Sequence, residues 1–161
     1  MQARAYRFGM KKIDRSKTPI QRGTGYPAPH DEIVREREWQ RLGDAAGLTQ
    51  FGVNLVTLKP GVWSSQRHWH SHEDEFVYML EGELVLATDT GDELLHPGDC
   101  AGFPAGSREG HCLKNLSDKI ARFLVVGSRN PDDWGEYSDI DMKFLSEREG
   151  GAYVRKNGDK F

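Results

Sequence analysis

Residues 67–75, which read RHWHSHEDE, contain three histidines, two glutamates and an aspartate. On a β-strand alternate side chains share a face, so His68 and His70 would point one way and Trp69 the other. A tight bend in the SHED stretch would return Glu75 to the same centre. Two imidazoles and one carboxylate on one side of a cation leave its other positions open to water, a substrate or dioxygen. The spacing therefore predicts a metal site.

A fourth ligand has to come from another part of the sheet, and His111 is the natural candidate. It follows GFPAG on a predicted strand, with Cys112 facing away from it. Because hairpins already bring distant strands together, the roughly forty residues between the two segments cost little to close.

His72 continues the alternation of His68 and His70. We interpret it as a residue of the pocket rim or the surface, with a contact to substrate or to a metal ligand as the alternative. It is also the one weak candidate for a base that moves a proton, and the catalytic residues are otherwise unidentified. No serine-histidine-acid or cysteine-histidine arrangement suggests nucleophilic catalysis.

The bulk composition is that of an ordinary soluble domain. The 161 residues suit one domain, with 37% hydrophobic and 29% charged residues. The net charge of -3 compels no polyanionic partner, and no window approaches the ~18 to 20 apolar residues of a membrane span. We therefore expect neither a nucleic acid nor a membrane as a partner. Cys100 and Cys112 are too few for a disulfide scaffold, which favours a cytoplasmic protein with both thiols buried.

The chain is expected to divide into three parts. Residues 1–30 form an extended or poorly ordered segment, and its basic start is interpreted as a solvated tail, with a transit segment or a nucleic-acid arm as alternatives. Residues 31–130 form the β-barrel, and residues 131–161 form an extension that packs on it. Residues 32–47 favour a strand that turns into the next one, although a helix stays open. Residues 131–147 are predicted to include a short helix.

Short apolar runs broken by turns fill residues 48–129. Their spacing of roughly ten residues is typical of an antiparallel barrel or sandwich. The stretch LVLATDTGDELL predicts a hairpin around DTGD. Gly82, Gly91 and Gly98 are predicted to occupy turns that need a positive φ.

Two motifs in this region resemble those of the cupin superfamily. The first comprises Gly61, His68-x-His70, Glu75 and Gly82, and the second comprises Gly98, Pro104-x-Gly106, His111 and Asn115. The gaps from Gly61 to His68 and from Gly106 to His111 are longer than the usual family pattern, and both fall in predicted turns. The match covers residues 50–128, about half of the chain.

This resemblance implies an all-β, jelly-roll-like antiparallel barrel that binds one divalent transition metal. By resemblance the metal ligands would be His68, His70, Glu75 and His111. Family members use iron, manganese, zinc, nickel or copper there, and ligand type alone does not choose among these metals. Cupins commonly pair, so we expect a homodimer.

Four residues are predicted to line the pocket beside the metal: Val77, Met79, Phe103 and Arg122. The first two share the side of the strand that carries Glu75, while Phe76 and Tyr78 fall on the other face. Arg67 and Trp69 are expected on the outside of the sheet or against a partner subunit.

The favoured function is a metal-dependent enzyme that acts on a small organic molecule. In a dioxygenase-like version, substrate and dioxygen occupy the open metal positions; in an isomerase or lyase version, the metal polarises a carbonyl and a base moves a proton. The alternative is a non-catalytic module that binds or senses a small molecule. The roughly fifty residues before the barrel show no pair of amphipathic helices with a short turn, which argues against a DNA-reading regulator.

Overall fold

The computed structural model describes residues 12–161. The first eleven residues of the predicted N-terminal segment, including the basic Arg4, Arg7 and Lys11, lie outside the described residues. Within the described part, no helix is long and apolar enough to cross a membrane.

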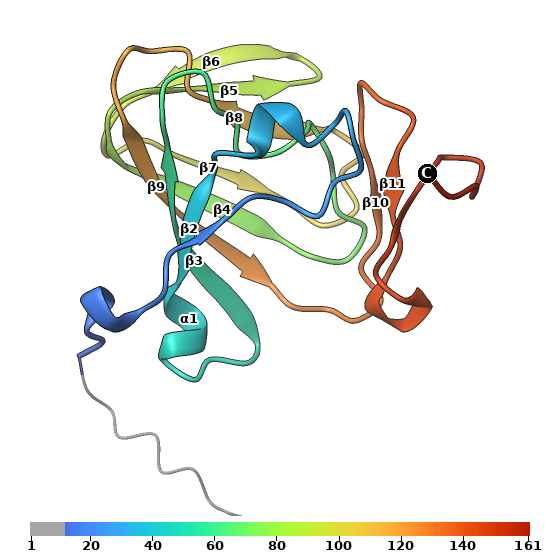
Figure 1. The fold of residues 1–161 in the computed structure, drawn as a ribbon, viewed down its shortest axis with the longest axis horizontal. Coiled ribbons are helices and arrows are strands. Elements are labelled where there is room, and N and C mark those ends of the chain that lie inside the picture. Colours follow the sequence, from blue (N-terminus) through green and yellow to red (C-terminus); the bar gives the residue numbers. More distant parts are fainter. Residues whose placement is uncertain (1–11) are drawn as a thin grey trace, which may run out of the picture.

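The fold is mostly β, and its paired strands are antiparallel (Figure 1). The larger sheet has six strands in the order β1 (Gln21–Arg22), β2 (Glu38–Arg41), β3 (Phe51–Leu58), β9 (Ala121–Ser128), β4 (Glu75–Glu81) and β7 (Cys100–Phe103). A three-stranded sheet has the order β6 (Gly91–Leu95), β5 (Leu84–Thr88) and β8 (His111–Lys114). The predicted all-β, jelly-roll-like class is confirmed.

The core lies between these two sheets. Buried residues from both sheets form one cluster, including Leu58 on β3, Met79 on β4, Leu86 on β5 and Phe123 on β9. Such a cluster forms because each strand buries alternate side chains and leaves the others exposed.

Strand β4 shows the predicted alternation directly. Val77 and Met79 are buried, whereas Phe76 and Tyr78 are 42% and 41% exposed. A sharp turn then leads into β5 at Gly82, where φ is +72° and an added Cβ would lie 2.5 Å from the Ile120 carbonyl oxygen. Only glycine fits this turn without strain. The predicted β5–β6 hairpin and the positive φ at Gly91 and Gly98 are also confirmed.

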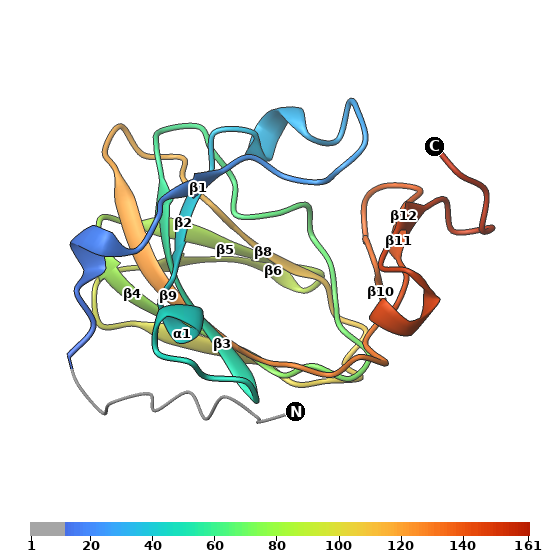
Figure 2. The same ribbon diagram turned by 60° about the horizontal axis from the view of Figure 1, so that its bottom comes forward.

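The C-terminal extension forms a small sheet of its own, β10 (Gly135–Glu136), β11 (Lys143–Phe144) and β12 (Tyr153–Val154). Figures 1 and 2 show it to one side of the two larger sheets. The helix predicted within residues 131–147 is absent from this described segment. Helical structure in the extension is the 3-10 turn at Glu147–Glu149, which a capping box between Ser146 and Glu149 stabilises.

The N-terminal part contributes an edge strand and three short turns. Strand β1 pairs with β2, and residues 32–47 contain a 3-10 turn (Glu32–Val34), strand β2 and one helical turn, α1 (Leu42–Ala45). The predicted strand in this segment is therefore confirmed, and GDAAG forms part of a helical turn before β3. A second 3-10 turn spans Arg15–Lys17.

Two burial predictions are wrong. Cys100 is exposed because alternation on β7 turns it outward, while Cys112 is buried. Trp69 is 7% exposed and packs edge-on against Trp134 at 5.2 Å, so it does not face outward. Arg67 is also partly covered, by its ion pair with Asp139. Residues 64–74 form no regular strand, so strict alternation does not govern them.

Candidate metal centre and cavity

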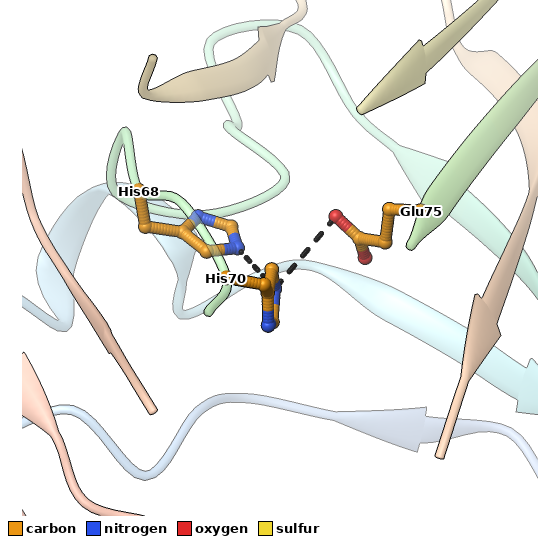
Figure 3. A group of neighbouring side chains, drawn as sticks. All are labelled: His68, His70 and Glu75. Carbon is orange, nitrogen blue, oxygen red and sulfur yellow. Dashed lines mark hydrogen bonds and ion pairs between the residues drawn. The ribbon is translucent and has the colours of Figure 1, made fainter. Parts of the chain in front are cut away.

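His68 and His70 direct one ring nitrogen each at a common point (Figure 3). The Nδ1 atom of His68 lies 2.9 Å from the Gln66 carbonyl oxygen, and the Nδ1 atom of His70 lies 2.6 Å from Asp133 Oδ2. Because both oxygens can only accept, each Nδ1 carries the hydrogen, and the neutral imidazole then keeps a lone pair on Nε2.

The two Nε2 atoms are 3.1 Å apart. Two lone pairs at this separation repel each other unless a cation lies between them. Glu75 adds a carboxylate, with Oε2 3.9 Å from His70 Nε2. His68, His70 and Glu75 thus converge as a group with the ligand atoms and spacing of a metal site.

His111 reaches this group from β8. Its Nε2 lies 2.8 Å from Glu75 Oε2, and its backbone pairs with that of His68 in both directions. The ring stacks on Phe103 with centroids 3.6 Å apart and planes within 2°. The Nδ1 atom of His111 is buried without a hydrogen-bond partner, so the ring is held by stacking on Phe103 and by the contact of Nε2 with Glu75. All four predicted ligands therefore lie together, and we call them the ligand wall.

The donor set fits a divalent transition metal. Two ligands held about 2.1 Å from one ion lie about 3.0 Å apart at right angles and about 3.4 Å apart at tetrahedral angles. The three separations in the ligand wall, 2.8, 3.1 and 3.9 Å, bracket these values. Imidazole nitrogens with one carboxylate also suit such a metal better than magnesium or calcium.

The electrostatics keep His68 neutral and Glu75 ionised, which are the protonation states that bind cations. Burial, together with the charges of His70 and His111, lowers the pKa of His68 to about 3. Burial alone would raise the pKa of Glu75, but the hydrogen bond from His111 and the charges of the histidines lower it to about 2. A neutral imidazole therefore faces an ionised carboxylate.

Asp133 holds this arrangement in place from the loop after β9. Besides His70 Nδ1, its carboxylate accepts hydrogen bonds from the backbone nitrogens of His72 (2.8 Å) and Glu73 (3.2 Å). Burial raises the pKa of Asp133, but the hydrogen bonds from His70, His72 and Glu73, together with the charge of His70, lower it overall, so the group stays ionised. Such partners fix the orientation of a metal-binding histidine. Sequence reasoning missed Asp133 because no spacing signal links it to residues sixty positions earlier.

The ligand wall borders a cavity of about 470 Å³. This volume is in the range of small-molecule sites. Val77 and Phe103 line it as predicted from the sequence, but Met79 and Arg122 lie elsewhere. Met79 is fully buried in the core, and Arg122 faces away on β9 and pairs with Glu81. By alternation, β9 instead turns Phe123 and Val125 toward the cavity.

His72 lies outside this lining. Its side chain is exposed and bonds Ser71 Oγ at 2.7 Å, while its neighbour Glu73 does line the cavity. Glu73 Oε1 accepts the backbone hydrogen of Asn130 at 2.7 Å. Glu73 is therefore a further acidic group on the cavity beside His70, and sequence alternation did not single it out.

A second part of the lining comes from the chain's two ends. Tyr26 packs edge-on against Tyr137 at 5.4 Å and against Tyr153 at 5.2 Å, and Tyr137 lies 5.7 Å from the His68 ring. Arg37 lines the same cavity. We call Tyr26, Arg37, Tyr137 and Tyr153 the tyrosine wall. No motif marked these residues, since they come together only when the N-terminal segment meets β10–β12 (Figure 1).

Comparisons with known proteins agree with this fold and site. The model of the cupin domain family matches residues 54–127. A cupin superfamily sugar phosphate isomerase from Silicibacter pomeroyi has 46% sequence identity and a TM-score of 0.90, covering 94% of this chain and 96% of that chain. A candidate sugar phosphate isomerase from Acidithiobacillus ferrooxidans has 28% identity and a TM-score of 0.71, covering 78% and 80%.

Among curated proteins, quercetin 2,3-dioxygenase from Bacillus subtilis is 33% identical over 64 residues, 40% of this chain and 19% of that protein. The chain spans less than half the length of the curated relatives that it matches. With the fold, the ligand wall and these likenesses together, the chain belongs to the cupin superfamily.

Proposed function

We propose that this cupin is a metal-dependent isomerase of a small hydroxy-carbonyl compound of the sugar class. One observation carries the proposal: the ligand wall lies on a cavity of small-molecule size that is also lined by Glu73, an arginine and three tyrosines. The likeness over 94% of the chain to a sugar phosphate isomerase supports the choice of reaction. His68, His70, Glu75 and His111 would hold one divalent metal, such as iron, manganese, zinc or nickel.

A bound metal of this kind polarises a carbonyl and makes the neighbouring carbon-bound hydrogen more acidic. Glu73 would take that proton from one carbon and return it to the next. The hydroxyl proton passes to the former carbonyl oxygen, so the substrate keeps its composition and no oxidant is consumed. Glu73 is placed for this role because its carboxylate lies beside His70 and Asp133 on the cavity surface.

The tyrosine wall would orient the substrate's hydroxyl groups. Burial raises the pKa of Tyr26 to about 12, and it also raises the pKa values of Tyr137 and Tyr153. All three therefore stay protonated near neutral pH and can donate hydrogen bonds.

The test incubates the purified protein anaerobically in deuterium oxide with a panel of sugar phosphates and free sugars. We expect isomerisation with deuterium incorporated at carbon, measured by NMR. Glu73→Gln should lower turnover by about 10²- to 10⁴-fold, as loss of a general base does. Its metal content should stay unchanged, and Glu83→Gln, a control at an exposed turn, should keep turnover. Turnover that requires dioxygen would contradict the proposal.

A dioxygenase is the second candidate, because of the local likeness to quercetin 2,3-dioxygenase. It predicts turnover with iron that stops both without dioxygen and when zinc replaces iron. A ligand that co-purifies and stays unchanged under every condition would instead indicate a non-catalytic binding or sensor module.

We also propose that the chain forms a homodimer through the outer face of β4. Phe76, Tyr78 and Leu80 form an apolar row there, and Leu80 is 45% exposed. A two-fold axis would bury the same row on both copies. Light scattering should give twice the 18.2 kDa chain mass. Tyr78→Glu should give monomers, whereas Leu94→Glu, at an exposed leucine on β6, should not.

A further inference from the structure

Arg37 places a positive charge in the cavity beside the tyrosines. It lies just before β2, is partly buried, and its guanidinium sits 4.7 Å from the centre of the Trp39 ring. Nη1 donates to the Ser64 carbonyl oxygen, and Nη2 makes a long contact of 3.4 Å with the Gly23 carbonyl oxygen. These two bonds hold the side chain in position.

The rest of the guanidinium lacks acceptors. Nε of Arg37 is buried and has no hydrogen-bond partner. Guanidinium presents five N–H donors, so two carbonyl bonds leave most of them unused. A donor without an acceptor is costly. Because Arg37 lines the cavity, its unused N–H groups there can meet an acceptor from outside the chain.

The charge of Arg37 is also uncompensated. Among residues 12–161, no carboxylate lies within 4.0 Å of its nitrogens, unlike Arg22, Arg35 and Arg67. The buried acids of the cavity are already engaged, since Glu75 bonds His111 and Asp133 bonds His70. An anion from solution would therefore not have to displace a carboxylate of the protein from Arg37.

The surrounding hydroxyls complete an anion-binding environment. Arg37, Tyr26 and Tyr153 line the same cavity. Burial raises the pKa values of both tyrosines, so their hydroxyls stay protonated. Protonated tyrosines beside an arginine offer further donors to an oxyanion. Tyr137 connects this region to the ligand wall, because it lies 5.7 Å from His68 and 5.4 Å from Tyr26.

We propose that Arg37 binds the phosphate group of the substrate, while the carbonyl end of the same molecule lies at the ligand wall. The planar fork of arginine matches two phosphate oxygens, and such charge-assisted bonds are stronger than neutral ones. This inference rests on the proposed isomerase and names its substrate class as a phosphomonoester. It assigns the preference for a phosphorylated over a free sugar to Arg37.

The direct test titrates the full chain with inorganic phosphate and follows binding by calorimetry and by ³¹P NMR. We expect saturable binding, and Arg37→Gln should weaken it about tenfold to hundredfold. Arg37→Lys keeps the charge but loses the fork, so its loss should be smaller. Arg35→Gln is the matched control: Arg35 lies two residues away and pairs with Asp31 on the surface, so this variant should bind like the wild type.

Thermal unfolding separates this role from a structural one, because Arg37 also ties the N-terminal segment to Ser64. If Arg37→Gln does not fold, Arg37→Lys carries the test, since its long side chain can still reach the Ser64 carbonyl. Phosphate that binds the folded Arg37 variants as tightly as the wild type, for example through a metal, would overturn the inference. Absence of any phosphate binding to the wild type would also overturn it.

Failure of the phosphate subsite can be distinguished from failure of the proposed isomerase. Phosphate binding that depends on Arg37, without any isomerisation, would keep the subsite and reject the isomerase. Isomerisation of free and phosphorylated sugars at equal kcat/KM, in both wild type and Arg37→Gln, would keep the isomerase and reject the subsite.

Discussion

The two walls of the cavity are built in different ways. In the ligand wall, His68 and His70 each have one nitrogen committed to a protein acceptor and the other left free toward the same centre. In the tyrosine wall, Arg37 has unused donors and shares the cavity with three tyrosines. One wall therefore presents lone pairs to a cation, and the other presents N–H and O–H groups to an anion or to hydroxyls. A substrate with a carbonyl at one end and a negative group at the other satisfies both.

The walls also differ in their supports. The ligand wall stands on β4, β8 and the backbone pairing between His68 and His111, next to the core. The residues of the tyrosine wall lie in or beside short elements near the two ends of the described chain, the N-terminal segment and β10–β12. Substitutions in the ligand wall should therefore change metal binding, and substitutions in the tyrosine wall should change substrate binding.

Loss of a ligand should have the largest effect. His70→Ala or His111→Ala removes one of four donors, so metal content after purification should fall from about one per chain to near zero. Elemental analysis by mass spectrometry measures this content. His72→Ala is the control and should retain metal, because His72 lies outside the cavity lining. Full occupancy in His111→Ala would contradict a four-ligand site.

Loss of the Asp133 carboxylate, which orients His70, should have a smaller effect on metal binding than loss of a ligand. Asp133→Asn keeps the shape but replaces a carboxylate with a neutral amide, so metal affinity should fall about 10- to 100-fold. Competition with a fluorescent chelator measures it. Asp132→Asn, at the exposed neighbour that pairs with Arg148, should change little. Equal affinity in both variants would show that Asp133 does not orient the ligand.

The protonation state of the ligand wall makes the stability of the metal-free protein pH-dependent. His68 has a pKa of about 3 in the fold and an ordinary value of 6.5, so below pH 6.5 the unfolded chain binds more protons. Stability is then lost as the pH falls, by about 2 kcal/mol between pH 6.5 and pH 5. Glu75 adds to this loss below its ordinary value of 4.5.

Urea unfolding with chelator at pH 7.5 and pH 5 measures this difference. His68→Asn should reduce it by about 2 kcal/mol relative to the wild type. The exposed His96→Asn should leave it unchanged. Burial lowers the pKa of His70, but the hydrogen bond to Asp133 and the charges of Glu75, Asp133 and Glu73 together raise it overall. His70 therefore acts in the opposite direction and is left intact in both variants. An unchanged difference in His68→Asn would show that burial does not shift its pKa.

The smallest effect on metal affinity is expected from a substitution in the tyrosine wall, because this wall should not contribute to metal binding. Tyr153→Phe removes one hydroxyl from the tyrosine wall, and metal affinity should stay within about twofold of the wild type because sites without shared partners act separately. The same chelator competition measures it. A loss comparable to that of Asp133→Asn would mean that the two walls form one coupled network.

Much of the ligand wall was predictable because its residues follow short-range spacing. Residue types in two short segments indicated His68, His70, Glu75 and His111. The strand alternation invoked for His68 and His70 does not hold, since residues 64–74 lack a regular strand. The two rings still converge because the His68 backbone pairs with His111 and because Asp133 orients His70. The same departure from alternation explains the wrong expectation for Trp69.

By itself the sequence determined the antiparallel β class, the main turns and the four residues of the ligand wall, because period-two patterning, glycine turns and histidine spacing are local. The tertiary structure alone decided which residues surround them. Asp133, Glu73 and Arg37 reach the cavity through loops and chain ends whose pairing no local pattern encodes. It also decided that Arg122 turns outward while Phe123 and Val125 turn in, because register against β4, and not residue type, sets the face of β9.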